Sequence, residues 1–245
     1  MSSTETKSLT DRGGAVREGE ALDVAAVENW LRAEGIALDG QAELTQFSGG
    51  ASNWTYRLKY ANRDLILRRP PAGTKAKSAH DMQREYRVQS ALKPQYPAVP
   101  DMVALCTDES VIGCDFYVMD RIDGIIPRAN LPRGLELSQA QVRALCENAI
   151  DKLAELHRVD YRVAGLESLG KGDGYVRRQV EGWSARYLKA KTWNVPSFRK
   201  VRDWLHANMP DDVATCVRGV VQATVFPAPS STVIALYPFD LSPTR

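Results

Sequence analysis

Residues 47 to 92 place three features in a fixed order: a glycine pair, an apolar strand that ends in arginine, and a helix that carries a glutamate. Gly49 and Gly50 lie between two alternating apolar segments. Glycine adopts positive φ without a Cβ penalty, so this backbone can approach a bulky anion closely. Residues 65–67 are all apolar and predict a buried strand, with Arg68 at its end. The order therefore joins a loop suited to phosphate with a nearby cation.

The helix that follows is expected to begin at Ser78, because Ser78-x-x-Asp81 is a capping box. Four of its side chains fall on one side at three- and four-residue steps: Met82, Glu85, Gln89 and Leu92. A carboxylate that faces the core is costly unless a cation meets it. Arg68 is the natural partner of Glu85, and Arg69 is the rival, since strand parity sends neighbours to opposite faces.

Residues 48–53 have two interpretations. They could cover a phosphate, with Ser52 and Asn53 as additional polar contacts, or they could form a plain hairpin with glycines for the turn. On local sequence alone the hairpin is favoured, because Gly-Gly turns are common. The downstream Arg68 and Glu85 favour the phosphate loop.

The remaining pattern predicts several short strands followed by helices. Strands are expected near 43–48, 52–60, 64–69, 102–107 and 115–120, with a tight hairpin at Ala61-Asn62. Helices are expected after Asp23, after the capping box Ser138-x-x-Gln141, from about residue 173, and after Ser197. His157 ends the apolar stripe of the helix that follows Ser138, and a lone histidine there is more often a core residue than a catalyst.

Six stretches in this order resemble the aminoglycoside-phosphotransferase-like kinases, in the branch related to the kinase-like domains fused to acyl-CoA dehydrogenases. They lie between about residues 22 and 212: FSGGASNWTYRL, LILRRPP, SAHDMQREYRVQSAL, DFYVMDRIDG, LAELHRVD and LGKGDGYVRRQVEGWSARY. The resemblance implies an α+β, protein-kinase-like fold of two lobes, with an antiparallel sheet plus one helix in the N-lobe and a partial helical C-lobe. The implied divisions are a disordered segment 1–20, an N-lobe 21–122, a C-lobe 123–212 and an atypical tail 213–245.

The same resemblance implies ATP as the cofactor and a small molecule as the second partner. The implied nucleotide-binding residues are Gly49, Gly50, Ser52, Asn53, Arg68, Glu85, Asp120, Arg121 and Ile122. Backbone groups of Asp120 to Ile122 would meet the adenine edge where the chain crosses between the lobes. A buried strand running into a loop is the alternative for that stretch. Basic side chains of the helical part could meet an anionic substrate such as a CoA ester, or could simply be solvated: Arg177, Arg178, Arg186, Lys189 and Lys191.

Phosphoryl transfer also needs a carboxylate that orients the acceptor hydroxyl, and an Asn and an Asp that hold Mg²⁺. The family supplies them in a His-Gly-Asp-x-x-x-x-Asn loop and a later Asp. In this sequence Arg218 and Val220 stand where the motif's His and Asp would be, Pro238 stands for the metal-binding Asp, and Asp240 alone makes a poor metal site. Residues 213–245 hold only three charged residues in 33. No catalytic or metal-binding residue is therefore assigned.

Composition excludes other classes of protein. A net charge of +2, with 44% hydrophobic and 25% charged residues, gives no case for nucleic acid or an anionic membrane. The four cysteines show no C-x-x-C spacing, which favours reduced thiols in a cytoplasmic protein over a metal site. The resemblance implies a phosphotransferase by descent, with ATP-dependent phosphorylation of a small-molecule hydroxyl such as that of a hydroxyacyl compound. Because the motif's catalytic and metal-binding residues are missing, we expect this chain to be inactive. The alternatives are a pseudokinase that binds nucleotide or a partner, and a truncated or frame-altered fragment.

Overall fold

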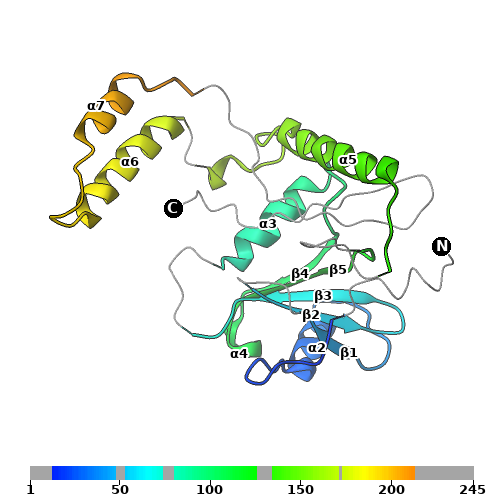
Figure 1. Cartoon of the computed structure of the whole chain (residues 1–245). Coiled ribbons are helices and arrows are strands. Elements are labelled where there is room, and N and C mark those ends of the chain that lie inside the picture. Colours follow the sequence, from blue (N-terminus) through cyan, green and yellow to red (C-terminus); the bar gives the residue numbers. More distant parts are fainter. Residues whose placement is uncertain (1–12, 48–52, 74–79, 126–133, 171–172, 213–245) are drawn as a thin grey trace. The chain divides into compact units, whose positions relative to one another are not determined.

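The computed structural model describes residues 13–47, 53–73, 80–125, 134–170 and 173–212 (Figure 1). Gly49, Gly50, Ser52 and the tail 213–245 lie outside the described residues. The described chain divides into two compact units, one that ends at Val159 and one that begins at Asp160. Within the described residues, no helix has the length and apolar character needed to cross a membrane.

The first unit contains a five-stranded antiparallel sheet in the order β1-β2-β3-β5-β4. Its strands are β1 (Glu43–Gln46), β2 (Trp54–Lys59), β3 (Asp64–Arg69), β4 (Met102–Cys106) and β5 (Phe116–Asp120). All five lie where the alternating pattern predicts them, and the α+β fold class is confirmed. The Tyr60 N–H donates to the Arg63 carbonyl over 2.7 Å, which closes the predicted hairpin between β2 and β3.

Two helices cover opposite faces of this sheet (Figure 1). Helix α2 (Val24–Ala33) packs on the face that carries most of the apolar core, and its Trp30 meets Phe116 edge-on with ring centroids 5.1 Å apart. Helix α3 (Met82–Leu92) lies on the other face, where Met82 joins Ile66, Tyr117 and Met119. Because strand residues alternate between faces, each residue of β3 is committed to one helix or the other.

The start of α2 follows the predicted chemistry, and a glycine lies just beyond its end. The Asp23 carboxylate accepts the Ala26 N–H at 2.9 Å, so it caps the first turn. The helix ends before Gly35, whose φ of +81° is the left-handed conformation that glycine adopts without strain.

The N-terminal segment differs from the prediction. We expected residues 1–20 to be disordered, but residues 13–20 are bonded to the sheet, while residues 1–12 lie outside the described part. Gly14 pairs with Gln46 through two backbone hydrogen bonds of 2.8 and 2.9 Å. The buried Tyr56 hydroxyl donates to the Glu20 carbonyl at 2.6 Å. Polar composition misled the prediction because these bonds use backbone groups, which any side chain allows.

The start of α3 also differs. Asp81, not Ser78, is its N-cap, and the Asp81 carboxylate accepts the Arg84 N–H at 2.9 Å. Ser78 lies outside the described residues. His80 has φ of +66°, which no right-handed helix contains, so the helix cannot begin before Asp81.

The short helix α4 (Glu109–Ile112) connects β4 to β5. Helix α5 (Gln139–Arg158) begins at the predicted capping box, in which Ser138 and Gln141 bond reciprocally. Its apolar stripe is buried only near the end, at Leu156, whereas Val142 and Cys146 are exposed. The core assignment of His157 was wrong, because this side chain is exposed.

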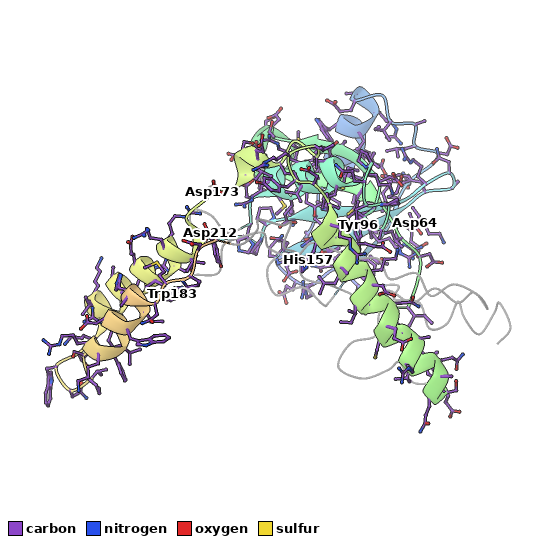
Figure 2. All side chains as sticks on the ribbon, turned by 90° about the horizontal axis from the view of Figure 1, so that it is seen from above. Asp64, Tyr96, His157, Asp173, Trp183 and Asp212 are labelled. Carbon is purple, nitrogen blue, oxygen red and sulfur yellow. The ribbon has the colours of Figure 1, made fainter. Side chains whose placement is uncertain are left out.

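The second unit holds η1 (Glu167–Leu169), α6 (Tyr175–Ala190) and α7 (Arg199–Ala207), close to the predicted helices. The Asp212 carboxylate accepts the N–H groups of Gly174, Tyr175 and Val176 at the start of α6, the last two at 2.9 Å. Figure 2 shows Asp212 beside this end of α6, near Asp173. Since the first N–H groups of a helix have no partner within it, the chain that follows α7 satisfies the start of α6.

Candidate functional site

An ion pair joins the central strand β3 to helix α3. Arg68 Nη1 lies 3.3 Å from Glu85 Oε2, and their side chains are 5% and 20% exposed. Glu85 comes from the first turn of α3, one turn after Met82, which anchors the helix in the apolar cluster of this face. The Arg68 guanidinium also lies over the Tyr117 ring, 5.9 Å from its centroid. The carboxylate that sequence periodicity directed toward the sheet therefore has its cation.

The neighbouring Arg69 points to the opposite face, as strand parity requires. Its Nη2 donates to the Ala21 carbonyl at 2.7 Å and to the Tyr56 hydroxyl at 3.0 Å. Its guanidinium lies over the Trp54 ring, 4.8 Å from the ring centroid. Arg69 thus fastens the N-terminal segment to the sheet, and the rivalry for Glu85 is decided in favour of Arg68.

Glu85 has two further hydrogen-bond donors. Asn53 Nδ2 donates to Glu85 Oε1 at 2.8 Å, and the Tyr117 hydroxyl donates to Glu85 Oε2 at 2.9 Å. Burial raises the pKa of Tyr117 above its ordinary value, so the hydroxyl keeps the proton that it donates. Gln89 Nε2 lies 3.4 Å from the Tyr117 oxygen. The carboxylate is therefore held from β5, from the start of β2 and from β3.

Asn53 does not stand free beside the predicted loop. Its side chain is buried, and its Oδ1 lies 2.6 Å from His80 Nδ1 while its Nδ2 bonds to Glu85. Sequence analysis missed both His80 and Tyr117. Tyr117 stands opposite Arg68 in the pairing of β3 with β5, a register that the sequence alone does not set. His80 precedes the N-cap of α3, and nothing in its sequence context marks its positive φ.

At the end of β5, backbone donors are already in use. The Asp120 N–H donates to the Asp101 carbonyl at 2.8 Å, and the Arg121 N–H donates to the Asp64 carbonyl at 2.9 Å. Within the described chain, the Ile122 N–H donates to no backbone carbonyl. Of the three residues predicted to meet an adenine edge, Asp120 and Arg121 thus already use their N–H groups within the protein.

A charged cluster around Asp64 fixes this end of the sheet. Asp64 accepts two hydrogen bonds from Arg57, at 2.7 and 2.6 Å, and Arg121 Nη1 lies 3.3 Å from Asp64 Oδ2. Burial pushes the pKa of Asp64 upward, but the hydrogen bonds and charges of Arg57 and Arg121 outweigh it and hold this pKa below its usual value. Arg121 also pairs with Asp123 at 2.9 Å, which orders the chain just beyond β5.

The described residues contain no group of three or more His, Cys, Asp and Glu side chains arranged to hold a metal ion. What they offer instead is a fixed guanidinium. Arg68 is buried and its carboxylate partner is held by two other donors, so the guanidinium is fixed in place, and a planar guanidinium binds phosphate oxygens well. The predicted partners Gly49, Gly50 and Ser52 lie outside the described residues.

A five-stranded antiparallel sheet, joined by an arginine–glutamate pair to one helix on its face, defines a kinase-like N-lobe. Comparison with known proteins gives the family. The "Phosphotransferase enzyme family" matches residues 43–218, and the chain therefore belongs to this family.

The relatives place the chain in a particular branch. It is 35% identical over 231 residues to mouse (Mus musculus) acyl-CoA dehydrogenase family member 10, and 37% identical over 210 residues to chicken (Gallus gallus) acyl-CoA dehydrogenase family member 11. These alignments cover 93% and 84% of this chain but only 21% and 26% of the relatives. The chain thus spans about a quarter of the curated relatives that it matches.

Solved structures agree with this assignment. A crystal structure from Ralstonia eutropha, assigned as an aminoglycoside phosphotransferase, is 34% identical with a TM-score of 0.62; the match covers 78% of this chain and 54% of that one. A type I macrolide 2'-phosphotransferase has the same fold at 19% identity and a TM-score of 0.52, over 84% of this chain and 67% of that one. The predicted family and the kinase-like fold are confirmed.

Proposed function

We propose that this chain is the nucleotide-binding part of a phosphotransferase, and that it binds ATP through the Arg68–Glu85 pair. The observation that supports this most directly is the fixation of Glu85, whose two oxygens are bonded to Asn53, Tyr117 and Arg68. Such a pair holds a cation where a nucleotide phosphate needs it, which is the task of the corresponding ion pair in protein kinases. Residues 49, 50 and 52 would cover the phosphates, and the Ile122 N–H would meet the adenine edge.

The reaction class of the family is ATP-dependent phosphorylation of a small-molecule hydroxyl, and we propose that this chain does not carry it out. Transfer needs an oriented acceptor and bound Mg²⁺. Val220 and Pro238, at the positions matched to the two motif aspartates, have neither proton acceptors nor metal ligands on their side chains. The chain would then act as a non-catalytic nucleotide-binding pseudokinase domain, and Mg²⁺ would enter only with the nucleotide.

For the acceptor of the parent reaction, we propose a hydroxyacyl compound rather than an antibiotic. Support comes from the relatives, which are named as acyl-CoA dehydrogenase family members. Because this chain matches about a quarter of their length, the proposal concerns their shared domain only.

ATP binding is tested by titrating ATP while following thermal unfolding, since a ligand that binds only the folded state raises the melting temperature by mass action. Wild type should show an ATP-dependent rise that Arg68→Ala weakens. Arg69→Met is a matched control, because it removes the adjacent guanidinium from the opposite face of the same strand. It should lower the melting temperature but keep the rise with ATP. An unchanged wild-type melting temperature at millimolar ATP would refute the proposed site.

Turnover is tested separately, by following γ-phosphate transfer from MgATP to aminoglycosides and to hydroxyacyl-CoA compounds. We expect no transfer above background from the purified chain. Transfer that Arg68→Ala abolishes would show that the catalytic loop lies elsewhere in this sequence than at residues 218–220.

A further inference from the structure

A chain of three polar side chains links the beginning of β2 to helix α3. His80 Nδ1 lies 2.6 Å from Asn53 Oδ1, and Asn53 Nδ2 lies 2.8 Å from Glu85 Oε1. His80 precedes the N-cap of α3, and Asn53 precedes β2, so the chain joins segments that are 27 and 32 residues apart in sequence. Asn53 is 4% exposed, and both ends of its amide are used within the protein.

The direction of each hydrogen bond follows from the chemistry of Glu85. A carboxylate paired with a guanidinium only accepts hydrogen bonds, so the Asn53 group that faces it must be the NH₂ donor. The Asn53 carbonyl oxygen then faces His80. Because this oxygen only accepts, His80 Nδ1 must carry a proton. The distances and this donor order therefore fix one protonation pattern for the imidazole at Nδ1.

The backbone at His80 is held in a conformation that L-residues seldom adopt. Its φ is +66°, in the left-handed region. Non-glycine residues persist there when surrounding contacts over-determine them, and such residues cluster at functional sites. Here the contact to Asn53 and the start of α3 at the next residue, Asp81, supply that constraint.

We propose that Asn53 and His80 are positioning residues of the nucleotide site. Asn53 occupies Glu85 Oε1, which leaves Oε2 to Tyr117 and Arg68 and sets the rotation of the carboxylate. His80 fixes Asn53 through its carbonyl oxygen. Their combined effect is to hold the Arg68 guanidinium in one place, ready for phosphate oxygens. This inference rests on the proposed ATP-binding function, and it gives Asn53 and His80 a role that acts through Glu85 and Arg68.

The test compares two substitutions of His80 that share backbone tolerance but differ in hydrogen bonding. His80→Gly relieves the positive φ but also removes the donor to the buried Asn53 carbonyl oxygen, so the two effects on the stability of the ATP-free protein oppose each other and the net change should be small. Its affinity for ATP should nevertheless fall about three- to tenfold, the loss expected from one hydrogen bond. His80→Asn keeps a donor on a short side chain and tolerates left-handed φ, so it should restore affinity toward wild type. A purely structural role would move stability and affinity together.

A second readout needs no nucleotide. Nitrogen-15 NMR of the imidazole should show a protonated Nδ1 in wild type, and Asn53→Ala should shift that resonance. If wild type binds ATP and His80→Gly binds it equally well, the positioning role is overturned and the proposed function stands. If wild type does not bind ATP, the proposed function fails, and a protonated Nδ1 that depends on Asn53 still supports the polar chain. An Nδ1 without a proton overturns the inference in either case.

Discussion

Replacing Arg68 with methionine tests the central contact of the fold directly. Methionine keeps an apolar stem of similar length, so packing along the strand is largely retained while the charge is lost. Glu85 then remains beneath the sheet face without its cation, although Asn53 and Tyr117 still donate to it. The substitution therefore isolates the ion pair from the hydrogen bonds around it.

The expected cost follows from burial. Removing one partner of a buried pair costs about 3–5 kcal/mol. Glu85 is 20% exposed and retains two donors, so we expect a smaller loss, about 2–3 kcal/mol. For a chain of this size that corresponds to a fall in melting temperature of about 4–12 °C. Arg143 is a matched control, since it pairs with Glu147 at 2.8 Å on α5 with 82% and 60% of the two side chains exposed. Arg143→Met should cost about 0.3–0.5 kcal/mol.

The assay is urea unfolding of the wild type and of four variants. Three are the single variants Arg68→Met, Arg143→Met and Glu85→Gln, and the fourth is the double variant Arg68→Met/Glu85→Gln. A direct pair should give a coupling free energy of about 0.5–3 kcal/mol in this cycle. The reasoning is refuted if Arg68→Met costs no more than Arg143→Met, or if the cycle shows no coupling.

Three further outcomes are expected. The pKa of Asp64 is held below its unfolded value, so the ionised carboxylate contributes stability above the unfolded pKa, and this contribution is lost as the pH falls through the folded pKa. Asp64→Asn should therefore flatten the acid side of the plot of unfolding free energy against pH. An unchanged plot would contradict the assignment. Asp212→Ala should speed hydrogen exchange at the Tyr175 and Val176 amides, which the carboxylate binds, without affecting β3; equal exchange in both proteins would argue against the cap. The uncharged, β-prone segment 233–237 should promote self-association, so a chain that ends at Asp212 should stay monomeric at higher concentration in light scattering. Slow exchange at 233–237 in a monomer would oppose this last expectation.

Periodicity predicted those parts of the fold in which one face of an element is buried. The alternation in β2 and the three- and four-residue spacing in α3 placed both elements and directed Glu85 toward the sheet, because burial imposes the same period on sequence and structure. Capping chemistry located the starts of α2 and α5, where a short polar side chain bonds the next turn.

Prediction failed where contacts depend on register or on backbone groups. The approach of Tyr117 to Glu85 requires β3 and β5 to be paired with Arg68 opposite Tyr117, and no local pattern specifies that offset. The ordering of residues 13–20 relies on backbone pairing with Gln46 and on Tyr56 and Arg69 of the sheet, which bond the Glu20 carbonyl. The composition of the segment itself does not reveal these partners. The positive φ of His80 is likewise set by tertiary contacts rather than by its own residue type. The roles of residues 49, 50 and 52 stay predictions.

The two adjacent arginines at the end of β3 cannot by themselves determine the register of this strand in the sheet. A shift of one residue turns every side chain of a strand to the other face, yet it would still bring an arginine toward Glu85. What such a shift could not reproduce lies at the strand's other end, where Asp64 would turn away from Arg57 and Arg121 toward the apolar side under α2. Asp64 therefore discriminates between Arg68 and Arg69 from four and five residues away, and a substitution at position 64 would place the guanidinium of the site less reliably.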